Sequence, residues 1–291
     1  MIGNATWSRW SLVPAVVLTT CPAAMAQRAI PEESKIGGFA IGCQAYTFNR
    51  FTAFEAIEKT ALAGGKVIEF YPGQSLSPEQ PDLKVGHEAP AEVVAILKSK
   101  LEEHGIEAVN YGVVGVPEDE QGARKVFEFA RAMGLRAITT ESVDAIDTLE
   151  KLAREYDVAV AFHNHPRRPD DPDYKVWDPK FVADLVEGRD PLIGACADTG
   201  HWARSGLEPV ECLRILEGRV ISAHLKDLDE MGPRGHDVPF GTGACDIRAV
   251  LDELEAQGFE GNLSIEYEHD WENNVPAVGQ CIGFVRGYAA D

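Results

Sequence analysis

Residues 192–202, LIGACADTGHW, join an apolar run to a polar turn that begins with Asp198. The run has the length of a buried strand, and the acid follows at its C-terminal end. Three more apolar runs end in the same way, ITTES at Glu141, ISAHLKD at His224 and LSIEYE at Glu266. A (β/α)8 barrel carries its chemistry at the C-terminal ends of its strands. These four residues are therefore the leading candidates for a functional site.

The rest of the chain repeats this pattern, with short apolar runs that alternate with amphipathic stretches. Strands are predicted at 37–44, 66–71, 106–112, 135–140, 158–163, 192–198, 220–225 and 263–267. Helices are predicted at 52–63, 90–104, 119–133, 142–155, 178–187, 208–217, 246–257 and 274–288. Eight of each in strict alternation predict an α/β fold, a single-domain (β/α)8 TIM barrel. An open doubly wound sheet would favour a glycine-rich loop after the first strand, and residues 42–45, GCQA, are not one.

Three long segments between predicted elements, 72–89, 164–177 and 227–245, all follow strands. They should therefore lie over the active face and shape the binding of a substrate. The sequence shows no low-complexity tract and no sign of a second domain.

The first 26 residues have the features of an export signal. Arg9 gives a weakly basic start, residues 10–20 are mostly apolar, and residues 24–26, AMA, form a small-x-small cleavage site. The apolar stretch is too short for a bilayer, which needs about 20 residues. A lipoprotein signal through residues 18–21, LTTC, is an alternative. The predicted division is a signal peptide at 1–26, a linker at 27–36 and a barrel at 37–291, in a periplasmic or secreted protein.

The chain has 27 basic and 47 acidic residues, and loss of Arg9 with the signal changes the net charge from −20 to −21. Such a surface repels phosphate backbones and anionic lipid, so nucleic acid is not an expected partner. No membrane span is expected either. Five cysteines would remain, an odd number without a C-x-x-C pair, and the sequence assigns no disulfide.

Three carboxylates and one imidazole at the C-terminal ends of four strands suit one divalent metal, Mn²⁺, Mg²⁺, Co²⁺ or Zn²⁺, without choosing among them. Such a metal can hold the carbonyl and hydroxyl oxygens of a sugar and stabilise the enediolate left when the adjacent C–H loses its proton. Glu141 or Glu266 can serve as the base. Lys226 lies two residues beyond His224 on the same strand face, where it can bind a developing oxyanion.

Further candidates for substrate binding lie near these strand ends. They are Glu69, His163, His165, His201 and His236. Other interpretations stay open, because the two histidines of residues 162–165 can be structural, His236 can be a surface residue and Glu69 can pair with a lysine. Glu268 shares a strand face with Glu266 and is an alternative ligand.

Four motifs together resemble the xylose isomerase-like TIM barrels. They are FHNH at 162–165, DTGH at 198–201, AHLKD at 223–227 and IEYE at 265–268. The resemblance covers residues 37–288 and implies a metal held by Glu141, Asp198, His224 and Glu266. It also implies Glu141 and Glu266 as the acid/base pair, and substrate contacts from His201 and Lys226. Isomerases, epimerases, dehydratases, eliminases and nucleases share this scaffold, so the resemblance does not fix the reaction.

The DTGH motif and the GTG of residues 241–243 after His236 are also similar to endonuclease IV. That resemblance implies a three-metal site with extra histidines after the second and third strands. This chain instead has EFY at 69–71 and NYG at 110–112. Together with the acidic surface, this disfavours a nuclease.

The predicted export signal bears on the substrate, because phosphorylated sugars are normally cytoplasmic metabolites. We therefore expect a metal-dependent isomerase or epimerase that abstracts a proton next to a carbonyl of a non-phosphorylated sugar. Similarity to exported members of the superfamily implies an alternative, a β-eliminase (lyase) of 3-keto-glycosides on the same metal site. A non-catalytic carbohydrate-binding barrel is the second alternative. The expected partner is a small-molecule carbohydrate, and a homo-oligomer stays possible.

Overall fold

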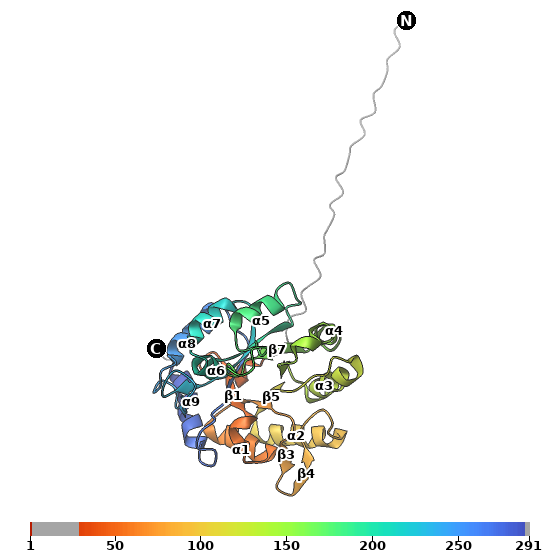
Figure 1. Cartoon of the computed structure of the whole chain (residues 1–291). Coiled ribbons are helices and arrows are strands. Elements are labelled where there is room, and N and C mark those ends of the chain that lie inside the picture. The colour runs from red at the N-terminus through yellow and green to blue at the C-terminus, as the bar shows by residue number, and fades with distance from the viewer. Residues whose placement is uncertain (2–28, 289–291) are drawn as a thin grey trace.

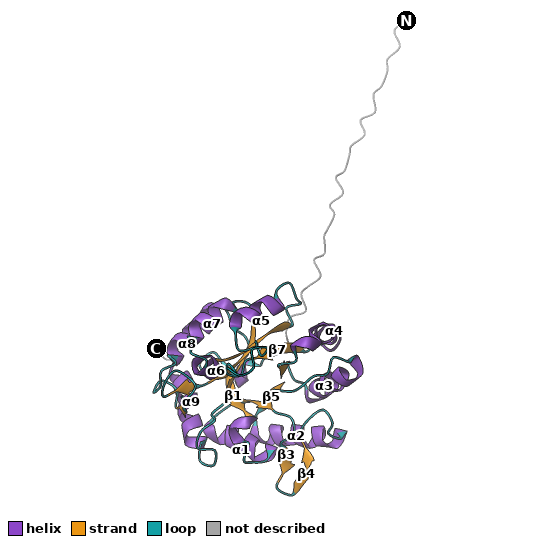
Figure 2. Cartoon of the chain, in the orientation of Figure 1, coloured by secondary structure: helices purple, strands orange, loops and turns teal. Residues whose placement is uncertain are grey.

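The computed structural model describes residue 1 and residues 29–288. Eight parallel strands form a closed barrel in the order β1-β12-β9-β8-β7-β6-β5-β2, and helices surround the strands (Figures 1 and 2). The barrel strands are β1 (Ala40–Gln44), β2 (Val67–Phe70), β5 (Glu107–Tyr111), β6 (Ala137–Thr140), β7 (Ala159–His163), β8 (Ile193–Asp198), β9 (Val220–Leu225) and β12 (Asn262–Ile265). The predicted (β/α)8 TIM barrel is confirmed. The predicted signal peptide lies outside the described residues.

The α-helices follow the predicted segments closely, with one addition. They are α1 (Ala53–Ala63), α2 (Ala91–His104), α3 (Glu120–Met133), α4 (Ile146–Tyr156), α5 (Pro179–Val186), α6 (Thr199–Arg204), α7 (Pro209–Ile215), α8 (Ile247–Ala256) and α9 (Val275–Tyr288). Short 3₁₀ helices lie at Glu32–Ser34, Ala45–Phe48 and Val143–Ala145. The additional helix is α6, which begins directly after β8 because the Asp198 side chain accepts a hydrogen bond from the His201 amide and caps it.

Local sequence explains where α1 starts and stops. Thr52 and Glu55 form a reciprocal capping box at its first turn. Gly64 ends it with a left-handed φ of 92°, a conformation that glycine adopts without a side-chain penalty.

The three predicted long segments all follow barrel strands, as expected. Residues 72–89 hold the hairpin of β3 (Ser75–Ser77) and β4 (Gln80–Lys84), which projects at the edge of the molecule in Figure 2. Residues 227–245 hold β10 (Asp227–Leu228) and β11 (Asp237–Val238). The third segment crosses from β7 to α5 without a helix or strand.

Asp227 ties the end of its long segment back to the barrel. Its carboxylate accepts hydrogen bonds from the amides of Gly241 and Gly243, both at 2.9 Å, and of Cys245 at 3.0 Å. A Cβ added to Gly243 would lie only 2.4 Å from Asp227 Oδ1, so a side chain there would break this arrangement. The segment therefore has a fixed shape above β9.

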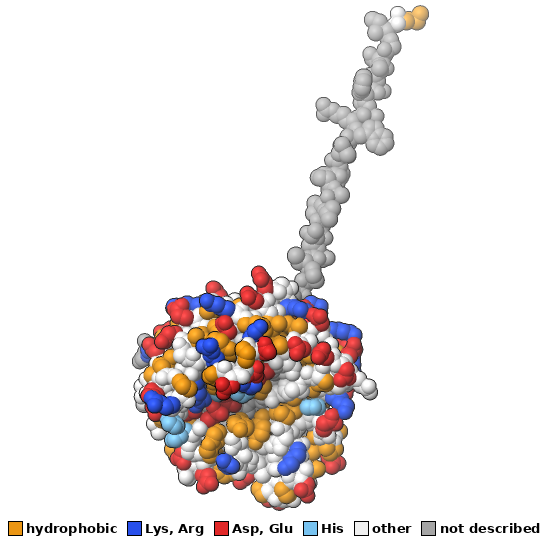
Figure 3. Space-filling view, in the orientation of Figure 1, with side chains coloured by type: hydrophobic (Ala, Val, Ile, Leu, Met, Phe, Trp, Pro, Cys, Tyr) orange, Lys and Arg blue, Asp and Glu red, His pale blue; other side chains and the backbone are white. Residues whose placement is uncertain are grey.

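Acidic and basic side chains are interspersed over the face of the molecule in Figure 3. Within residues 29–288, none of the helices has the length and apolar character needed to cross a membrane. The five described cysteines are buried and form no disulfide with one another.

Candidate metal centre

The register of the barrel brings three predicted ligands together. Asp198 lies opposite His224 in the β8–β9 pairing, and His224 lies opposite Ser264 in the β9–β12 pairing. Glu266 comes two residues after Ser264 and returns to the same face. One donor atom from each of these three ligands and from His163 lies within 4.8 Å of the others, and all four residues are buried.

His163 thus joins the group although we predicted it as a substrate contact. Its Nε2 lies 3.6 Å from Asp198 Oδ2, and its Nδ1 lies 3.7 Å from Glu141 Oε1. Glu141 belongs to a second group with His163 and His165. The structure therefore places His163 between the buried centre and Glu141.

Glu69 contacts His224 inside the barrel and orients its imidazole ring. Its carboxylate contacts His224 Nε2 at 3.0 Å and accepts hydrogen bonds from Thr139 at 2.8 Å and Ser264 at 3.1 Å. The other imidazole nitrogen, Nδ1, faces Glu266 at 3.4 Å. A carboxylate behind an imidazole fixes its tautomer and directs the free nitrogen to a metal. Glu69 itself is fully buried, so this geometry is that of a residue that positions His224, and its predicted contact with substrate stays a prediction.

The residues present fit a divalent metal. Within the described part of the chain, His224 Nδ1 and both ring nitrogens of His163 are buried without a hydrogen-bond partner. Buried polar atoms are normally paired, and a metal ion is one partner that satisfies an imidazole nitrogen. Two imidazoles and two carboxylates suit several first-row divalent metals, and the donor set does not select one.

Replacement of Glu69 by glutamine is expected to weaken metal binding by about 10- to 100-fold, because the neutral amide orients His224 less strongly. Competition between the protein and a fluorescent chelator for Mn²⁺ would measure the change. Glu79→Gln, at an exposed residue between β3 and β4, is the matched control. Equal Mn²⁺ affinities for Glu69→Gln and the control would contradict the positioning role.

Asn164 holds Asp198 in place and was missed in the sequence. Its amide nitrogen donates to the Asp198 carbonyl oxygen at 3.0 Å, and its side-chain oxygen accepts from the Asp198 amide at 2.9 Å. This pair of bonds joins the ends of β7 and β8. The sequence signal for Asn164 is its position inside FHNH, between His163 and His165, both of which are predicted substrate contacts.

Glu141 lies at the rim and binds the segment that follows β7. Its Oε1 accepts a hydrogen bond from the Tyr174 hydroxyl at 2.8 Å and lies 2.5 Å from His165 Nδ1. Arg168 stacks on the Tyr174 ring and lies 3.8 Å from Glu141 Oε2. Burial alone would raise the pKa of Glu141, but contacts with His163 and His165 outweigh it and hold this pKa well below its usual value. Glu141 is therefore ionised and oriented by this segment.

Two other predicted contacts lie at different depths. The His201 ring is buried, with Nδ1 at 3.3 Å from Arg204 and Nε2 at 3.7 Å from Asp198 Oδ2. The His236 ring is 66% exposed and lies beside His269, with ring centroids 5.6 Å apart. The structure thus brings His201 to the centre and leaves His236 on the surface.

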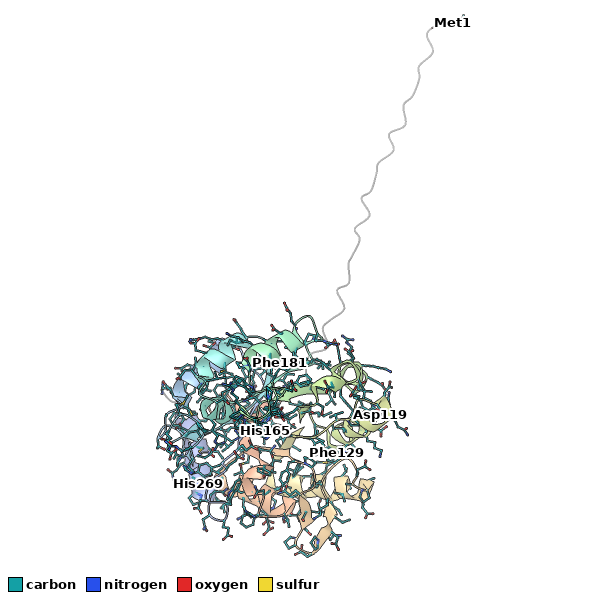
Figure 4. All side chains as sticks on the ribbon, viewed as in Figure 1. Met1, Asp119, Phe129, His165, Phe181 and His269 are labelled. Atoms are coloured by element: carbon teal, nitrogen blue, oxygen red, sulfur yellow. The ribbon has the colours of Figure 1, made fainter. Side chains whose placement is uncertain are left out.

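A cleft of about 320 Å³ opens beside the centre. Its lining comprises Gln44, Tyr46, Tyr71, Pro72, Gly112, Val113, His165, Glu266 and Glu268. Figure 4 shows His165 near the middle of the barrel. The lining thus combines two carboxylates and an imidazole with the aromatic rings of two tyrosines, groups that can hydrogen-bond to and pack against a small polar ligand.

A larger cavity of about 390 Å³ lies beneath the β3–β4 hairpin and is mostly apolar. Tyr111 and His87 line it and contact each other at 3.1 Å. None of the candidate ligands lines this cavity, so we assign the chemistry to the cleft beside Glu266.

The family model of the xylose isomerase-like TIM barrels matches residues 57–287, and the chain belongs to this family. The chain is 30% identical to an inosose dehydratase of Clostridium tetani over 142 residues, 43% of this chain and 45% of that protein. It therefore spans less than half the length of this relative.

Solved structures show the same architecture. The chain is 32% identical to an uncharacterized protein from Parabacteroides distasonis, with a TM-score of 0.68 over 86% of this chain and 98% of the other. A D-tagatose 3-epimerase-like protein is 16% identical, with a TM-score of 0.66 over 85% and 96% of the two chains. At that identity the second likeness supports the fold alone.

Proposed function

We propose that the protein is an enzyme of the sugar isomerase, epimerase or lyase type, which removes a proton next to a carbonyl of a non-phosphorylated carbohydrate. The observation that carries this proposal is the buried group of His163, Asp198, His224 and Glu266, of which Glu266 also lines a cleft with tyrosine side chains. Membership of the family and the similarity to an inosose dehydratase support the same class of reaction.

Asp198, His224 and Glu266 would hold the metal, and His163 would complete the buried set. When bound, a divalent metal supplies a Lewis acid that polarises a carbonyl oxygen. The sequence predicts Glu141 as a metal ligand and as one of the acid/base pair. We propose that it acts instead by orienting the imidazole of His165. This assignment uses the contact between Glu141 and His165 described above.

Two proton-transfer groups face the same cleft. Glu266 and His165 both line it, and His165 Nδ1 contacts Glu141. We propose that Glu266 takes the proton from the carbon next to the carbonyl, while the His165–Glu141 pair exchanges a proton with a second substrate atom. Lys226 adds a positive charge behind Glu266, which keeps this carboxylate ionised.

A base paired with an acid on one cleft serves epimerisation, isomerisation and β-elimination alike. The dehydratase relative favours elimination as the second candidate, because loss of water from a keto-sugar begins with the same proton abstraction. If the predicted export signal is used, the substrate is a free sugar or a 3-keto-glycoside in the periplasm or outside the cell.

The test is metal analysis of the purified protein, followed by incubation with free ketoses and 3-keto-glycosides in D₂O, read by NMR. Deuterium at the carbon next to the carbonyl would support isomerase or epimerase activity. Release of the aglycone with an unsaturated keto-sugar would support the lyase. Saturable sugar binding without exchange or release would contradict both and favour a binding protein.

A further inference from the structure

Lys226 is a buried cation that lies among the proposed metal ligands. Its side chain is fully buried, and its ammonium donates to Asp198 Oδ2 at 2.5 Å and to Glu266 Oε2. Glu268 Oε2 lies 3.8 Å away. The two oxygens that accept from Lys226 belong to residues of the proposed ligand set. The ammonium and a bound metal therefore draw on the same two carboxylates.

The position of Lys226 is built into the fold. Its backbone amide donates a hydrogen bond to the Thr199 hydroxyl oxygen at 3.0 Å, and its carbonyl oxygen accepts one from the same hydroxyl at 3.1 Å. A Cβ added to Gly200 would lie 2.4 Å from the Lys226 Cβ and 2.6 Å from its Cδ. Only a glycine leaves room for the lysine stem beside α6. The backbone and the stem are thus fixed, which holds the ammonium near the two carboxylates.

A second cation near the centre, Arg204, pairs with carboxylates other than the two that Lys226 binds most closely. Arg204 binds Asp237 at 2.6 Å and Glu268 at 3.0 Å, which draws Glu268 away from the ammonium. Asp198 and Glu266 are left as the close partners of Lys226. A positive charge fixed at these two oxygens lowers the negative potential that a metal meets, and burial strengthens that effect.

We infer that Lys226 is a permanent internal cation that shares Asp198 and Glu266 with the bound metal, and so sets a weak, exchangeable metal affinity. The inference rests on the metal centre of the proposed function. It gives Lys226 a second role besides the predicted substrate contact.

The test compares the wild-type protein with Lys226→Met and Lys226→Gln, using calorimetric titration with Mn²⁺ and chelator competition. Both variants remove the charge, and glutamine keeps donors for the two carboxylates if methionine prevents folding. We expect each folded variant to bind Mn²⁺ at least about tenfold more tightly than wild type, because one like charge no longer opposes the metal. Lys98→Met, at an exposed lysine of α2, should leave the affinity unchanged.

Thermal unfolding gives a second readout that does not depend on activity. Without added metal, Lys226→Met should unfold at a lower temperature than wild type, because two buried carboxylates lose their partner. Saturating Mn²⁺ should raise the melting temperature of the variant more than that of wild type.

Equal or weaker Mn²⁺ binding by both folded variants would overturn the role of Lys226 and leave the metal centre standing. If neither wild type nor variants bind Mn²⁺, Mg²⁺, Co²⁺ or Zn²⁺, the metal centre of the proposed function fails instead. Tight binding by the variants alone would support the inference in its strongest form.

Discussion

Glu266→Gln should lower kcat by about a thousandfold, with a much smaller change in KM. Glutamine keeps the size of the side chain but cannot take a proton at the cleft wall that Glu266 lines. It also removes one of the two carboxylates that contact Lys226 and one proposed metal ligand. The measurement is steady-state turnover of whichever keto-sugar the NMR test identifies.

Two further measurements separate chemistry from damage to the fold. Glu272→Gln, at an exposed residue on the loop after β12, should retain full turnover. Single-turnover rates of proton exchange in D₂O would show whether the lost step is proton abstraction. A Glu266→Gln variant that still exchanges substrate protons at the wild-type rate would show that another group is the base.

Removal of the metal is expected to have a comparable effect. Exhaustive dialysis against a chelator should lower turnover by about a thousandfold, because a Lewis acid contributes several kcal/mol to stabilisation of an enediolate-like transition state. Addition of Mn²⁺, Co²⁺, Mg²⁺ or Zn²⁺ one at a time should restore activity to different degrees and identify the preferred ion. Full activity in chelated protein, with metal content verified as negligible, would contradict a metal-dependent reaction.

The barrel and three of the proposed ligands could be predicted because they depend on local rules. Strand ends follow from apolar runs, and alternation of side chains along a strand sends Asp198 and His224 to the same side. Adjacent strands in a parallel barrel then place these residues beside each other, as the β8–β9 register confirms. Glu266 follows from the same rules one strand further on.

The depth of each side chain could not be predicted in the same way. Glu69 points into the barrel, but it lies beneath His224 because the stagger between strands sets the height of each residue. That stagger depends on how all eight strands close, which no single segment encodes. The contact of the Glu69 carboxylate with the His224 imidazole could therefore not be predicted from the sequence.

The position of Glu141 depended on a loop rather than on a strand. Its strand end was identified, but Tyr174 and His165 determine what its carboxylate contacts. Both belong to the segment after β7, which has no repeating pattern from which its path can be read. Long loops are shaped by such tertiary contacts, so the contacts of Glu141 could be seen only in the folded chain.

The carboxylate of Asp227, with its three backbone amide partners, has a consequence for engineering. Because Asp227 directly follows Lys226, the same short stretch of backbone supports both the candidate metal centre and the loop of residues 228–245. Transplanting residues 228–245 from a relative would keep the centre intact only if the donor loop brings amides that Asp227 can bind. Chimeras should therefore be cut on the far side of Cys245, and selected for donors with glycine at 243.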